Sequence, residues 1–390
     1  MWKNALRKAG SIAGWHIHDR YEATIIQEIS GHLSRELNSR FSRHDYEKLV
    51  AMDSQADKMM ELLDMKSDDV RFVGIHGMGG VGKTTLAEII YDRVSSNWGF
   101  EGSGFISCVR EKSATARDLA SLQKELLSTI MQEEIPIWDH HEGIRMIKKI
   151  LQNKKVFIVL DDVDSDEQLT ALAGDRKWFG PGSRVIITSR DIHPLRTHDV
   201  KDIHKVEQLE TAEALQLFSL SAFKKTHPIE DYKDLSMGFV NYAQGLPLAL
   251  KVLGSFLNER EIDAWKSEKD KLKAIPDPKI MDVLQISFDG LQKLQKDLFL
   301  DLACLFQKSL LSYEMLESCG YYRIDIDVLI EKSLISKSKY GWCPYLSMHD
   351  LLKELGQEIV RRECPDESGK RSRLFCWEDL YQVLKNDTVS

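Results

Sequence analysis

Hydrophobic and polar positions follow two different periods along this chain, and the change of period divides it. Between residues 70 and 210, short β-branched runs alternate with stretches of helical apolar spacing. The runs predicted to be strands are 71–75, 105–109, 155–160, 184–188 and 203–207. Strands that alternate with helices predict a parallel sheet with helices on both faces.

From Thr211 onward the strand pattern ends and only helical spacing continues. The predicted helices are 211–223, 231–243, 247–257, 260–272 and 278–286. Pro276 and Pro278 interrupt this series, which indicates a domain boundary close to them. We therefore expect an all-α domain to follow the sheet.

A third pattern covers residues 290–360. Helical stretches come first, and two short strands over 333–336 and 343–347 then flank Lys339-Tyr340-Gly341 as a β-hairpin. A helix from His349 to Arg362 closes the unit. Three helices and a hairpin predict a winged helix.

These patterns give one set of boundaries. Residues 1–45 are polar and helix-prone, with helical apolar spacing from Tyr21 to Leu37. The predicted regions are a connecting segment at 1–45, a P-loop α/β domain at 46–208, a helical domain at 209–285, a winged-helix domain at 286–362 and a linker at 363–390.

Composition narrows the class of protein. The 390 residues are 43% hydrophobic and 29% charged with a net charge of −8, which argues against a surface built to follow nucleic acid. The six cysteines lack metal-finger spacing, and the apolar stretch 246–257 is too short to span a membrane. Because no secretory signal is visible, we expect a cytoplasmic protein, with nuclear residence left open.

The sequence GMGGVGKT at 77–84 fits the phosphate-binding pattern G-x-x-x-x-G-K-[ST] in full. A predicted strand precedes it and a helical run follows, as this loop requires; the alternative is a Gly-rich hairpin that happens to precede a helix. The glycines let successive N–H groups surround a phosphate at the helix N-terminus, while Lys83 reaches the outer phosphates. The predicted phosphate-binding residues are Gly77, Gly79, Gly80, Val81, Gly82, Lys83, Thr84 and Thr85.

A second acidic motif ends the apolar strand at 155–160. Asp161 is predicted to hold Mg²⁺ through water together with the Thr84 hydroxyl, and Asp162 to orient or deprotonate an attacking water. The alternative is that both are N-cap aspartates of a helix that starts near Ser165. The P-loop favours the Mg²⁺ interpretation.

The strand 184–188 ends in Ser189-Arg190, where an arginine can contact a γ-phosphate and report which nucleotide is bound. The alternative is a solvated arginine at a strand end. The guanine-reading pattern Asn-Lys-x-Asp is absent after a strand, since 153–156 lacks the Asp and precedes one. The predicted cofactors are therefore ADP or ATP with Mg²⁺.

These motifs, in this order, resemble the NB-ARC module of plant TIR-type nucleotide-binding leucine-rich-repeat disease resistance proteins. Asp164 is the residue that this subclass has after its acidic strand. The matching segments are 77–84, 105–111, 160–164, 182–190, 206–209, 213–218, 245–249, 299–304 and 348–350. Residues 1–17 resemble the last helix of a TIR domain, whereas the helix that carries the catalytic glutamate of TIR domains has no counterpart here, so their NAD-cleaving activity is assigned to no residue of this chain. Residues 363–390 contain no leucine-rich-repeat pattern.

The resemblance implies an immune switch that ADP holds closed and ATP opens for self-association. ATP hydrolysis would be slow, with Arg190 as the γ-phosphate sensor and Asp162 replacing the glutamate of faster ATPases. Val50 lies in the segment that lines the adenine pocket in relatives, Pro247 would pack on the base, and His349 would reach the ADP β-phosphate. The implied partners are nucleotide, further copies of the chain, and its own TIR and repeat domains, with no membrane.

Local alternatives remain for 348–350, which could be a buried Met, a surface His and the N-cap Asp350 of the next helix. Three departures from the family pattern also stand out: Ala51, Gln55 and Ser189, of which the first two bear on adenine binding.

Three rival functions differ from a switch. A fast ATP-driven enzyme would need a substrate pocket of its own, and a purely structural module would not need an intact P-loop. A nucleotide-regulated transcription factor could use the winged helix. Its basic residues would be Arg361, Arg362, Lys370, Arg371 and Arg373, which we interpret as a solvated surface.

Overall fold

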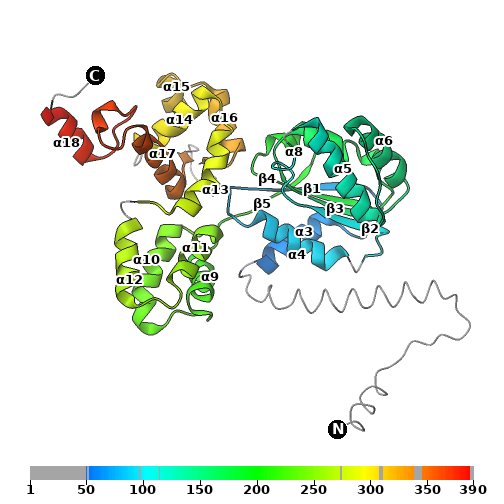
Figure 1. The fold of residues 1–390 in the computed structure, drawn as a ribbon, viewed down its shortest axis with the longest axis horizontal. Coiled ribbons are helices and arrows are strands. Elements are labelled where there is room, and N and C mark those ends of the chain that lie inside the picture. The colour runs from blue at the N-terminus through cyan, green and yellow to red at the C-terminus, as the bar shows by residue number, and fades with distance from the viewer. Residues whose placement is uncertain are drawn as a thin grey trace, which may run out of the picture.

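The computed structural model describes residues 50, 52–95, 98–113, 115–272, 275–306, 311–337 and 345–386. The helical spacing at 21–37, the TIR-like segment at 1–17, Ala51 and the centre of the predicted hairpin lie outside the described residues. Figure 1 shows an α/β domain, a helical domain and a winged-helix region that continues into a C-terminal helix.

A parallel sheet forms the centre of the α/β domain. Its strands are β1 (Arg71–His76), β2 (Gly102–Ile106), β3 (Val156–Val163), β4 (Arg184–Ser189) and β5 (Asp202–Lys205). They lie in the order β2-β3-β4-β1-β5, and every neighbouring pair is parallel. The predicted parallel sheet is confirmed, and its chain crossings put the carboxyl ends of β1, β3 and β4 at one edge.

The predicted position of the second strand is wrong by three residues. The strand was expected at 105–109, where apolar residues begin, but β2 starts at Gly102. A Cβ atom at Gly102 would lie 2.6 Å from the Ile130 side chain and 2.7 Å from its carbonyl oxygen. Gly102 therefore allows the covering helix to approach the strand closely. By its low strand propensity, a glycine is expected to break a strand, so the sequence pattern placed the start of this strand too late.

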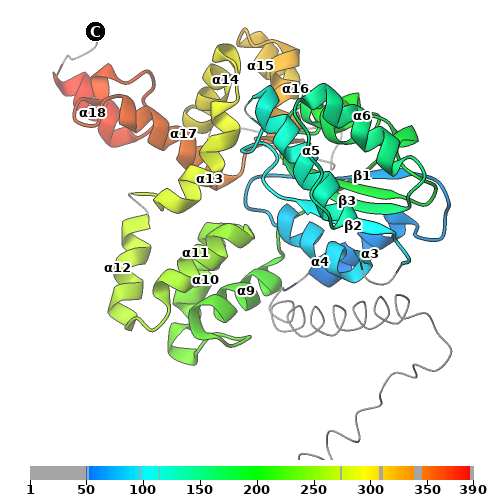
Figure 2. The ribbon, with the colours of Figure 1, turned by 45° about the vertical axis from the view of Figure 1, so that its right-hand side comes forward.

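Alternate side chains of the sheet enter two different hydrophobic cores. Val73, Phe157 and Ile186 face the helices α3 (Met52–Leu63) and α4 (Lys83–Ser95). Phe72 and Ile158 face the other side, which a second set of helices covers; Figure 2 labels the first two of them. These are α5 (Ala116–Met131), α6 (His140–Leu151), α7 (Asp166–Ala173) and α8 (His193–Thr197). Both faces are covered, which explains why the strands are apolar throughout rather than alternating.

The helical domain consists of α9 (Thr211–Phe223), α10 (Lys233–Ala243), α11 (Pro247–Leu257) and α12 (Ile262–Leu272). Trp265 is 1% exposed at its centre, and the rings of Phe218, Phe223, Tyr232 and Phe239 all lie within 5.8 Å of it, centroid to centroid. The predicted helices are confirmed, and aromatic packing holds them together.

Helix α13 (Pro278–Asp289) leads from the helical domain into the winged-helix region, and the boundary predicted at 285 lies inside this helix. The remaining elements are α14 (Lys293–Cys304), α15 (Tyr313–Ser318), α16 (Arg323–Glu331), β6 (Ser336–Lys337), β7 (Leu346–Ser347) and α17 (Asp350–Glu363). The two short strands pair antiparallel, as the hairpin prediction requires. The C-terminal helix is α18 (Trp377–Asn386).

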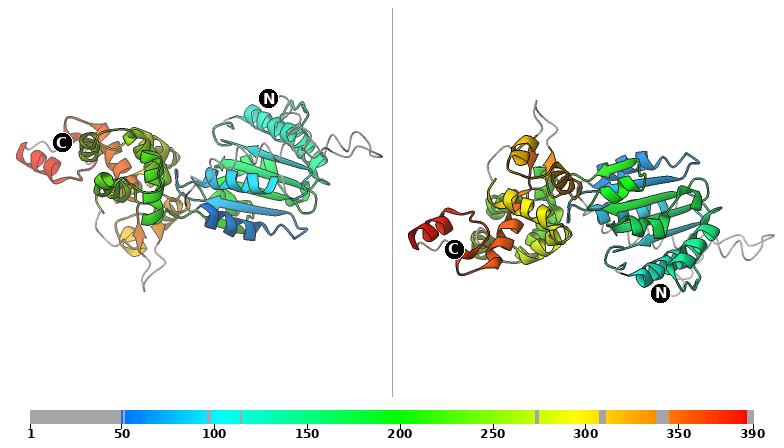
Figure 3. Two further views of the ribbon diagram at one scale, coloured as in Figure 1. Left: turned by 90° about the horizontal axis from the view of Figure 1, so that it is seen from below. Right: turned by 90° about the horizontal axis from the view of Figure 1, so that it is seen from above.

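The helical and winged-helix regions lie together on one side of the α/β domain, as Figure 3 shows from below and from above. They lie next to the sheet edge where β1 leads into the P-loop and where β3, the acidic strand, ends. Among the described residues, none of the helices combines the length and the apolar character needed to cross a membrane.

Candidate nucleotide-binding site

The P-loop joins β1 to α4 and has the backbone shape that its glycines predict. Gly80 and Gly82 have φ angles of 79° and 105°, in the left-handed region that favours glycine. A Cβ atom at Gly80 would lie 2.7 Å from the Cβ of Leu248. Any larger residue would therefore displace the helix that covers the loop.

Lys83 is the first residue of α4, and its side chain folds back over the loop. Nζ donates to the carbonyl oxygens of Gly77 at 2.8 Å and Met78 at 3.0 Å. Burial lowers the pKa of Lys83 to about 7, the positive charge of Arg190 adds to this shift, and Asp161 and Asp162 oppose it. An anion beside Nζ would favour the charged ammonium, so the site is suited to a phosphate.

Asp161 lies in a bulge of β3. Leu160 pairs with Ile187 and Val163 with Ser189, so that Asp161 and Asp162 together oppose the single residue Thr188. A bulge of this kind changes the direction in which side chains point. The predicted end of this strand at residue 160 is therefore wrong, because the strand continues through both aspartates.

The bulge brings the two predicted Mg²⁺ ligands together. Thr84 Oγ1 donates to Asp161 Oδ1 at 2.9 Å, and Thr188 Oγ1 donates to the same oxygen at 2.6 Å. Burial raises the pKa of Asp161, while these two hydroxyl groups act in the opposite direction. A buried carboxylate beside a P-loop hydroxyl fits Mg²⁺, which accepts one or two protein ligands and completes its shell with phosphates and water.

The interpretation of the two aspartates as helix N-caps is wrong. Ser165 caps α7, and its side chain accepts from the backbone N–H of Gln168. No group of three or more His, Cys, Asp or Glu side chains suited to a metal ion occurs in the part of the chain that the structure describes. A Mg²⁺ ion here would depend on the nucleotide for its other ligands.

Asp162 is held between two arginines. Its Oδ2 accepts from Arg110 Nε at 3.0 Å, and its Oδ1 accepts from Arg190 Nε at 3.3 Å. The residue has a φ angle of 59°, and its backbone N–H donates to Thr188 Oγ1. Both carboxylate oxygens are therefore engaged with cations, which differs from the role predicted for Asp162 in handling a water molecule.

Arg190 lies beside the P-loop with its side chain 19% exposed, so the alternative of a solvated arginine is wrong. Nη1 is 3.0 Å from the position that a Cβ atom at Gly79 would occupy, so the guanidinium adjoins the P-loop. The same Nη1 donates to the backbone oxygen of Val283 in α13 at 2.8 Å. One side chain thus contacts both the phosphate loop and the helix that leads into the winged-helix region.

The start of α11 covers the P-loop from the helical domain. Pro247 is buried at the first position of the helix, and the N–H of the next residue, Leu248, donates to the Gly80 carbonyl at 3.1 Å. The methyl group of Met52 would be 2.8 Å from a Cβ atom at Gly82, and Val50 packs on the same core. The segments of Val50 and Pro247 therefore both adjoin the loop, through Met52 at Gly82 and Leu248 at Gly80.

Thr85 and Gln55 belong to the two helices on this face of the sheet, α4 and α3. Thr85 is half-buried in the first turn of α4. Gln55 in α3 lies with its Oε1 3.4 Å from Nε2 of His204 on β5, which shows that the unusual Gln55 side chain has a partner within the α/β domain.

His349 caps α17, which corrects the prediction that Asp350 would do so. His349 Nδ1 accepts from the N–H of Leu351 at 3.1 Å, whereas Asp350 begins the helix and bonds to Gln244 and Lys353. Burial lowers the pKa of His349. Since Nδ1 accepts, the ring hydrogen is on Nε2, and this buried atom has no hydrogen-bond partner among the described residues. A buried donor of this kind fits an anionic ligand.

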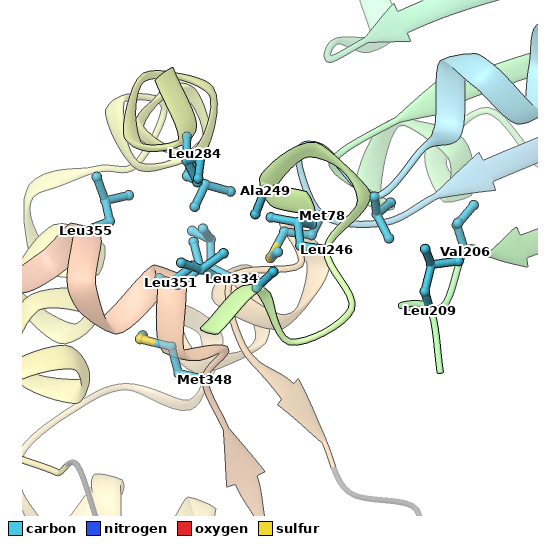
Figure 4. Packing of buried hydrophobic residues seen from close by; sticks show 14 of the residues in the cluster. Met78, Val206, Leu209, Leu246, Ala249, Leu284, Leu334, Met348, Leu351 and Leu355 are labelled. Atoms are coloured by element: carbon cyan, nitrogen blue, oxygen red, sulfur yellow. The ribbon is translucent and has the colours of Figure 1, made fainter. Parts of the chain in front are cut away.

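Gln244 connects this loop with the P-loop along the chain. Gln244 bonds to Asp350, and four residues later Leu248 bonds to Gly80. Met78 of the P-loop and Leu246 lie side by side in one apolar cluster with Leu334 and Leu351 of the winged-helix region (Figure 4). The hydrophobic core is thus continuous from the phosphate loop to the winged helix.

Sequence reasoning missed a contact segment at the end of α16. The carbonyl oxygen of Glu331 accepts from the N–H of Ile192 at 3.0 Å and lies 2.9 Å from Nε2 of His76. Ser333 Oγ is also 2.9 Å from this nitrogen, and Lys332 Nζ is 2.6 Å from Asp191 Oδ2. We call Glu331–Lys332–Ser333 the clasp segment.

The position of the clasp partners in the sequence is informative. His76 directly precedes the P-loop glycine Gly77, and Asp191 directly follows Arg190. Both phosphate motifs therefore adjoin a residue that contacts the clasp segment. A single sequence offers no signal for this, because the partners are more than 130 residues away from the clasp segment.

The parallel sheet, the P-loop and the acidic bulge define a P-loop nucleotide-binding fold. Residues 52–228 match the NB-ARC domain, and residues 292–364 match the winged-helix domain of Roq1-like disease resistance proteins. These segments therefore belong to the two domain families that plant disease resistance proteins combine, which confirms the resemblance stated above.

The relatives are plant proteins. Disease resistance protein RUN1 of Vitis rotundifolia is 43% identical over 98% of this chain, and TMV resistance protein N of Nicotiana glutinosa is 38% identical over 99%. The chain covers 28% and 34% of their respective lengths. Among solved structures, Cdc6p of Pyrobaculum aerophilum aligns with a TM-score of 0.44 at 13% identity, covering 80% of this chain and 94% of that one.

Proposed function

We propose that this chain is the ADP/ATP-controlled switch of a plant immune receptor. ADP would hold the winged-helix region against the α/β domain, and ATP would favour an open form that self-associates. The observation that carries this proposal is the clasp segment, because its partners His76 and Asp191 immediately flank the two phosphate motifs. A change of nucleotide at those motifs would therefore change the contact of the clasp segment with His76 and Asp191.

The phosphate end of the proposed site is built from the α/β domain. The P-loop N–H groups and Lys83 would hold the phosphates, and Thr84 and Asp161 would hold Mg²⁺. Val50 and Pro247 would enclose the adenine from two sides, a role that rests on the family resemblance. Bound Mg²⁺ would neutralise phosphate charge in this site.

The closed form would use His349 as a further phosphate contact. Its Nε2 is a buried donor, and its loop is tied through Gln244 to the segment that covers the P-loop. Arg190 supports the same coupling, since it links the P-loop side to Val283 of α13. A γ-phosphate that attracts Arg190 would compete with this domain contact.

Slow hydrolysis fits the surroundings of Asp162, whose oxygens both accept from guanidinium groups. A water molecule would have to compete with two cations for that carboxylate. We accordingly propose weak ATPase activity at most, as befits a switch rather than a motor.

The rival DNA-binding function has less support. The basic residues near the C-terminus are engaged within the protein: Arg371 contacts Asp379 and the backbone of Cys364, and Arg373 contacts Asp297 and Asp301. The interpretation of these two arginines as a solvated surface is wrong, because their side chains are 7% and 11% exposed. The same ion pairs leave them poorly suited to phosphate backbones.

The wider context stays a proposal as well. Self-association in the ATP state and contacts with TIR and leucine-rich-repeat domains are inferred from the disease-resistance relatives. Residence in the cytoplasm, with or without the nucleus, stays a prediction.

The test is to purify the chain without added nucleotide, denature it and identify what is released. Near-stoichiometric ADP is expected for the wild type. His349→Ala should lower the retained ADP several-fold, and His141→Ala, a change at an exposed histidine of α6, serves as the matched control. Absence of both ADP binding and ATP binding, with the fold intact by circular dichroism, would contradict the proposal.

A further inference from the structure

Arg110 is fixed in place by the backbone around it. After β2 the chain turns at Cys108, whose φ angle is 56°, and the N–H groups of Val109 and Arg110 then donate to the carbonyls of Asp161 and Asp162. The turn thus extends the sheet contact of β2 along the bulge of β3. This places the Arg110 side chain beside the Asp162 carboxylate without any requirement for nucleotide.

Further polar contacts make this turn rigid. Ser113 Oγ donates to the Arg110 carbonyl at 3.3 Å, and Gln168 Nε2 donates to Ser113 Oγ at 2.8 Å. Gln168, 5% exposed, also donates to Asp164. Ser113, Gln168 and Asp164 therefore support the turn that carries Arg110, while Arg110 Nη2 also reaches the exposed Glu111 at 3.4 Å.

The three charged groups form a row. Arg110 Nη2 is 2.9 Å from Asp162 Oδ2, and Arg190 Nε is 3.3 Å from Asp162 Oδ1. The three side chains are 20%, 17% and 19% exposed, so their charges are only partly screened by water. Because Glu111 offsets one of the two positive charges, what this row offers an anion is the N–H donors on the open side of Arg190 rather than a net charge.

That open side faces the phosphate loop. Arg190 uses Nε for Asp162 and Nη1 for Val283, and Nη1 also adjoins Gly79. A guanidinium has five N–H donors in a fixed plane. With Nε held by Asp162, the plane of Arg190 is set, and donors remain to meet a terminal phosphate.

We propose that Arg110 and Asp162 are positioning residues for Arg190, and that Asp162 acts in this bracket, through which the site recognises a third phosphate, rather than as a general base. Arg110 holds the Asp162 carboxylate, and Asp162 holds the plane of Arg190 toward Gly79. The inference rests on the proposed nucleotide switch and deepens it. It assigns Arg110, which the phosphate motifs do not include, to nucleotide discrimination.

The two roles of Asp162 predict different results. A general base is needed for hydrolysis and not for binding, so Asp162→Asn would abolish turnover and leave the ratio of ATP affinity to ADP affinity unchanged. A positioning residue is needed for that ratio. Arg110 has no place in the general-base role, which makes its variants the sharper test.

The experiment measures dissociation constants for Mg²⁺-ADP and for a non-hydrolysable Mg²⁺-ATP analogue on the full chain. Arg110→Gln should weaken the ATP analogue about tenfold relative to ADP, since a charge-assisted contact is lost. Arg110→Lys, which keeps the charge without the planar fork, should recover part of this preference. Arg117→Gln, at an exposed arginine of α5, is the matched control and should resemble wild type.

A double-mutant cycle tests the bracket itself. Asp162→Asn should shift the ATP-to-ADP ratio as Arg110→Gln does, and the double variant should add little to either change. Single-turnover hydrolysis by Asp162→Asn should keep the pH profile of wild type. Circular dichroism and thermal melting establish that each variant is folded. If Arg110→Gln does not fold, the ATP-to-ADP affinity ratio is measured on Arg110→Lys instead.

Several outcomes would overturn the inference. An unchanged ATP-to-ADP ratio in both Arg110 variants would remove Arg110 from the site. Loss of hydrolysis in Asp162→Asn with an unchanged ratio would restore the general base. A wild-type protein that binds neither nucleotide would instead overturn the proposed switch and, with it, this inference.

Discussion

The two sides of the candidate nucleotide site are built in different ways. On the α/β side, Lys83 and Asp161 are 7% and 3% exposed, and their partners belong to the same domain. On the winged-helix side, the contacts cross between domains and are wetter: the Lys332 and Asp191 side chains are 24% and 13% exposed, and that of Asp350 is 53% exposed. The first side is assembled by folding of the sheet, whereas the second depends on how the domains are placed relative to one another.

Because of this difference, we expect one side to determine nucleotide affinity and the other to determine which domain arrangement is populated. Buried contacts within one domain cost much to break and can hold the phosphates in either domain arrangement. Contacts that water can partly replace contribute less each, so a change of ligand can tip their balance. We expect variants on the α/β side to change how much nucleotide binds, and variants on the winged-helix side to change which form of the protein is populated.

The largest effect is expected from Lys83→Ala. It removes the only P-loop ammonium, which the backbone donors cannot replace, so ADP affinity should fall about a hundredfold or more. Isothermal titration calorimetry measures this directly. Lys124→Ala, at an exposed lysine of α5, is the control. Affinity within a few fold of wild type would remove Lys83 from the phosphate site.

The pH dependence of the same residue gives the second prediction. Burial lowers the pKa of Lys83 to about 7, and a phosphate requires the charged form. Above pH 7 each binding event must therefore take up a proton, and ADP affinity should fall up to about tenfold per pH unit between pH 7.5 and 9. Calorimetry in buffers of different ionisation enthalpy measures the proton uptake. Binding that is independent of pH, with no proton uptake, would contradict the low pKa.

The contrast between the two sides also explains what the sequence could predict. The P-loop, the acidic strand and Arg190 are short motifs at the ends of consecutive strands, and a parallel sheet brings such ends to one edge. Their proximity therefore followed from local pattern and topology. The contact between Thr84 and Asp161 is an example, although 77 residues separate them.

Other features depended on packing that no local pattern reveals. The start of β2 at Gly102 reflects the close approach of Ile130, and the bulge at Asp161 and Asp162 reflects their shared partner Thr188. The clasp segment has no motif because its chief polar contact uses the backbone carbonyl of Glu331, which any residue could supply. Side-chain identity carries little information about such a contact.

The third prediction concerns the clasp segment. Lys332→Ala leaves Asp191 largely buried without its cation, which should weaken the closed form by about 1–2 kcal/mol. Dissociation of ADP should become about tenfold faster, and small-angle X-ray scattering should show a larger radius of gyration. Lys293→Ala, at an exposed lysine at the start of α14, is the matched control. Unchanged ADP dissociation and size in Lys332→Ala would show that this ion pair does not hold the domains together.

The last prediction concerns the titration of His76, whose expected effect is similar in size to that of Lys332→Ala. Burial lowers its pKa from 6.5 to about 4 against the opposing hydrogen bond to the Glu331 carbonyl. The neutral ring is therefore favoured in the closed form, and its contribution is fully present above pH 6.5 and is lost as the pH falls toward 4. At pH 5.5 the closed form should be weakened by about 1.4 kcal/mol relative to pH 7.5, if opening restores an ordinary histidine pKa.

Other titratable groups near His76 must be separated from it to test this prediction. The positive charge of Lys83 disfavours a positive charge on the ring, whereas Asp191 and a hydrogen bond to the backbone of Arg190 favour it. His349, whose pKa burial also lowers, titrates in the same direction, so wild type alone cannot separate the two histidines. His76→Gln keeps a donor near the position of Nε2 without the titration. The acid-induced increase in ADP dissociation should therefore be smaller in His76→Gln than in wild type, and equal pH profiles would assign the effect to His349 or to another group.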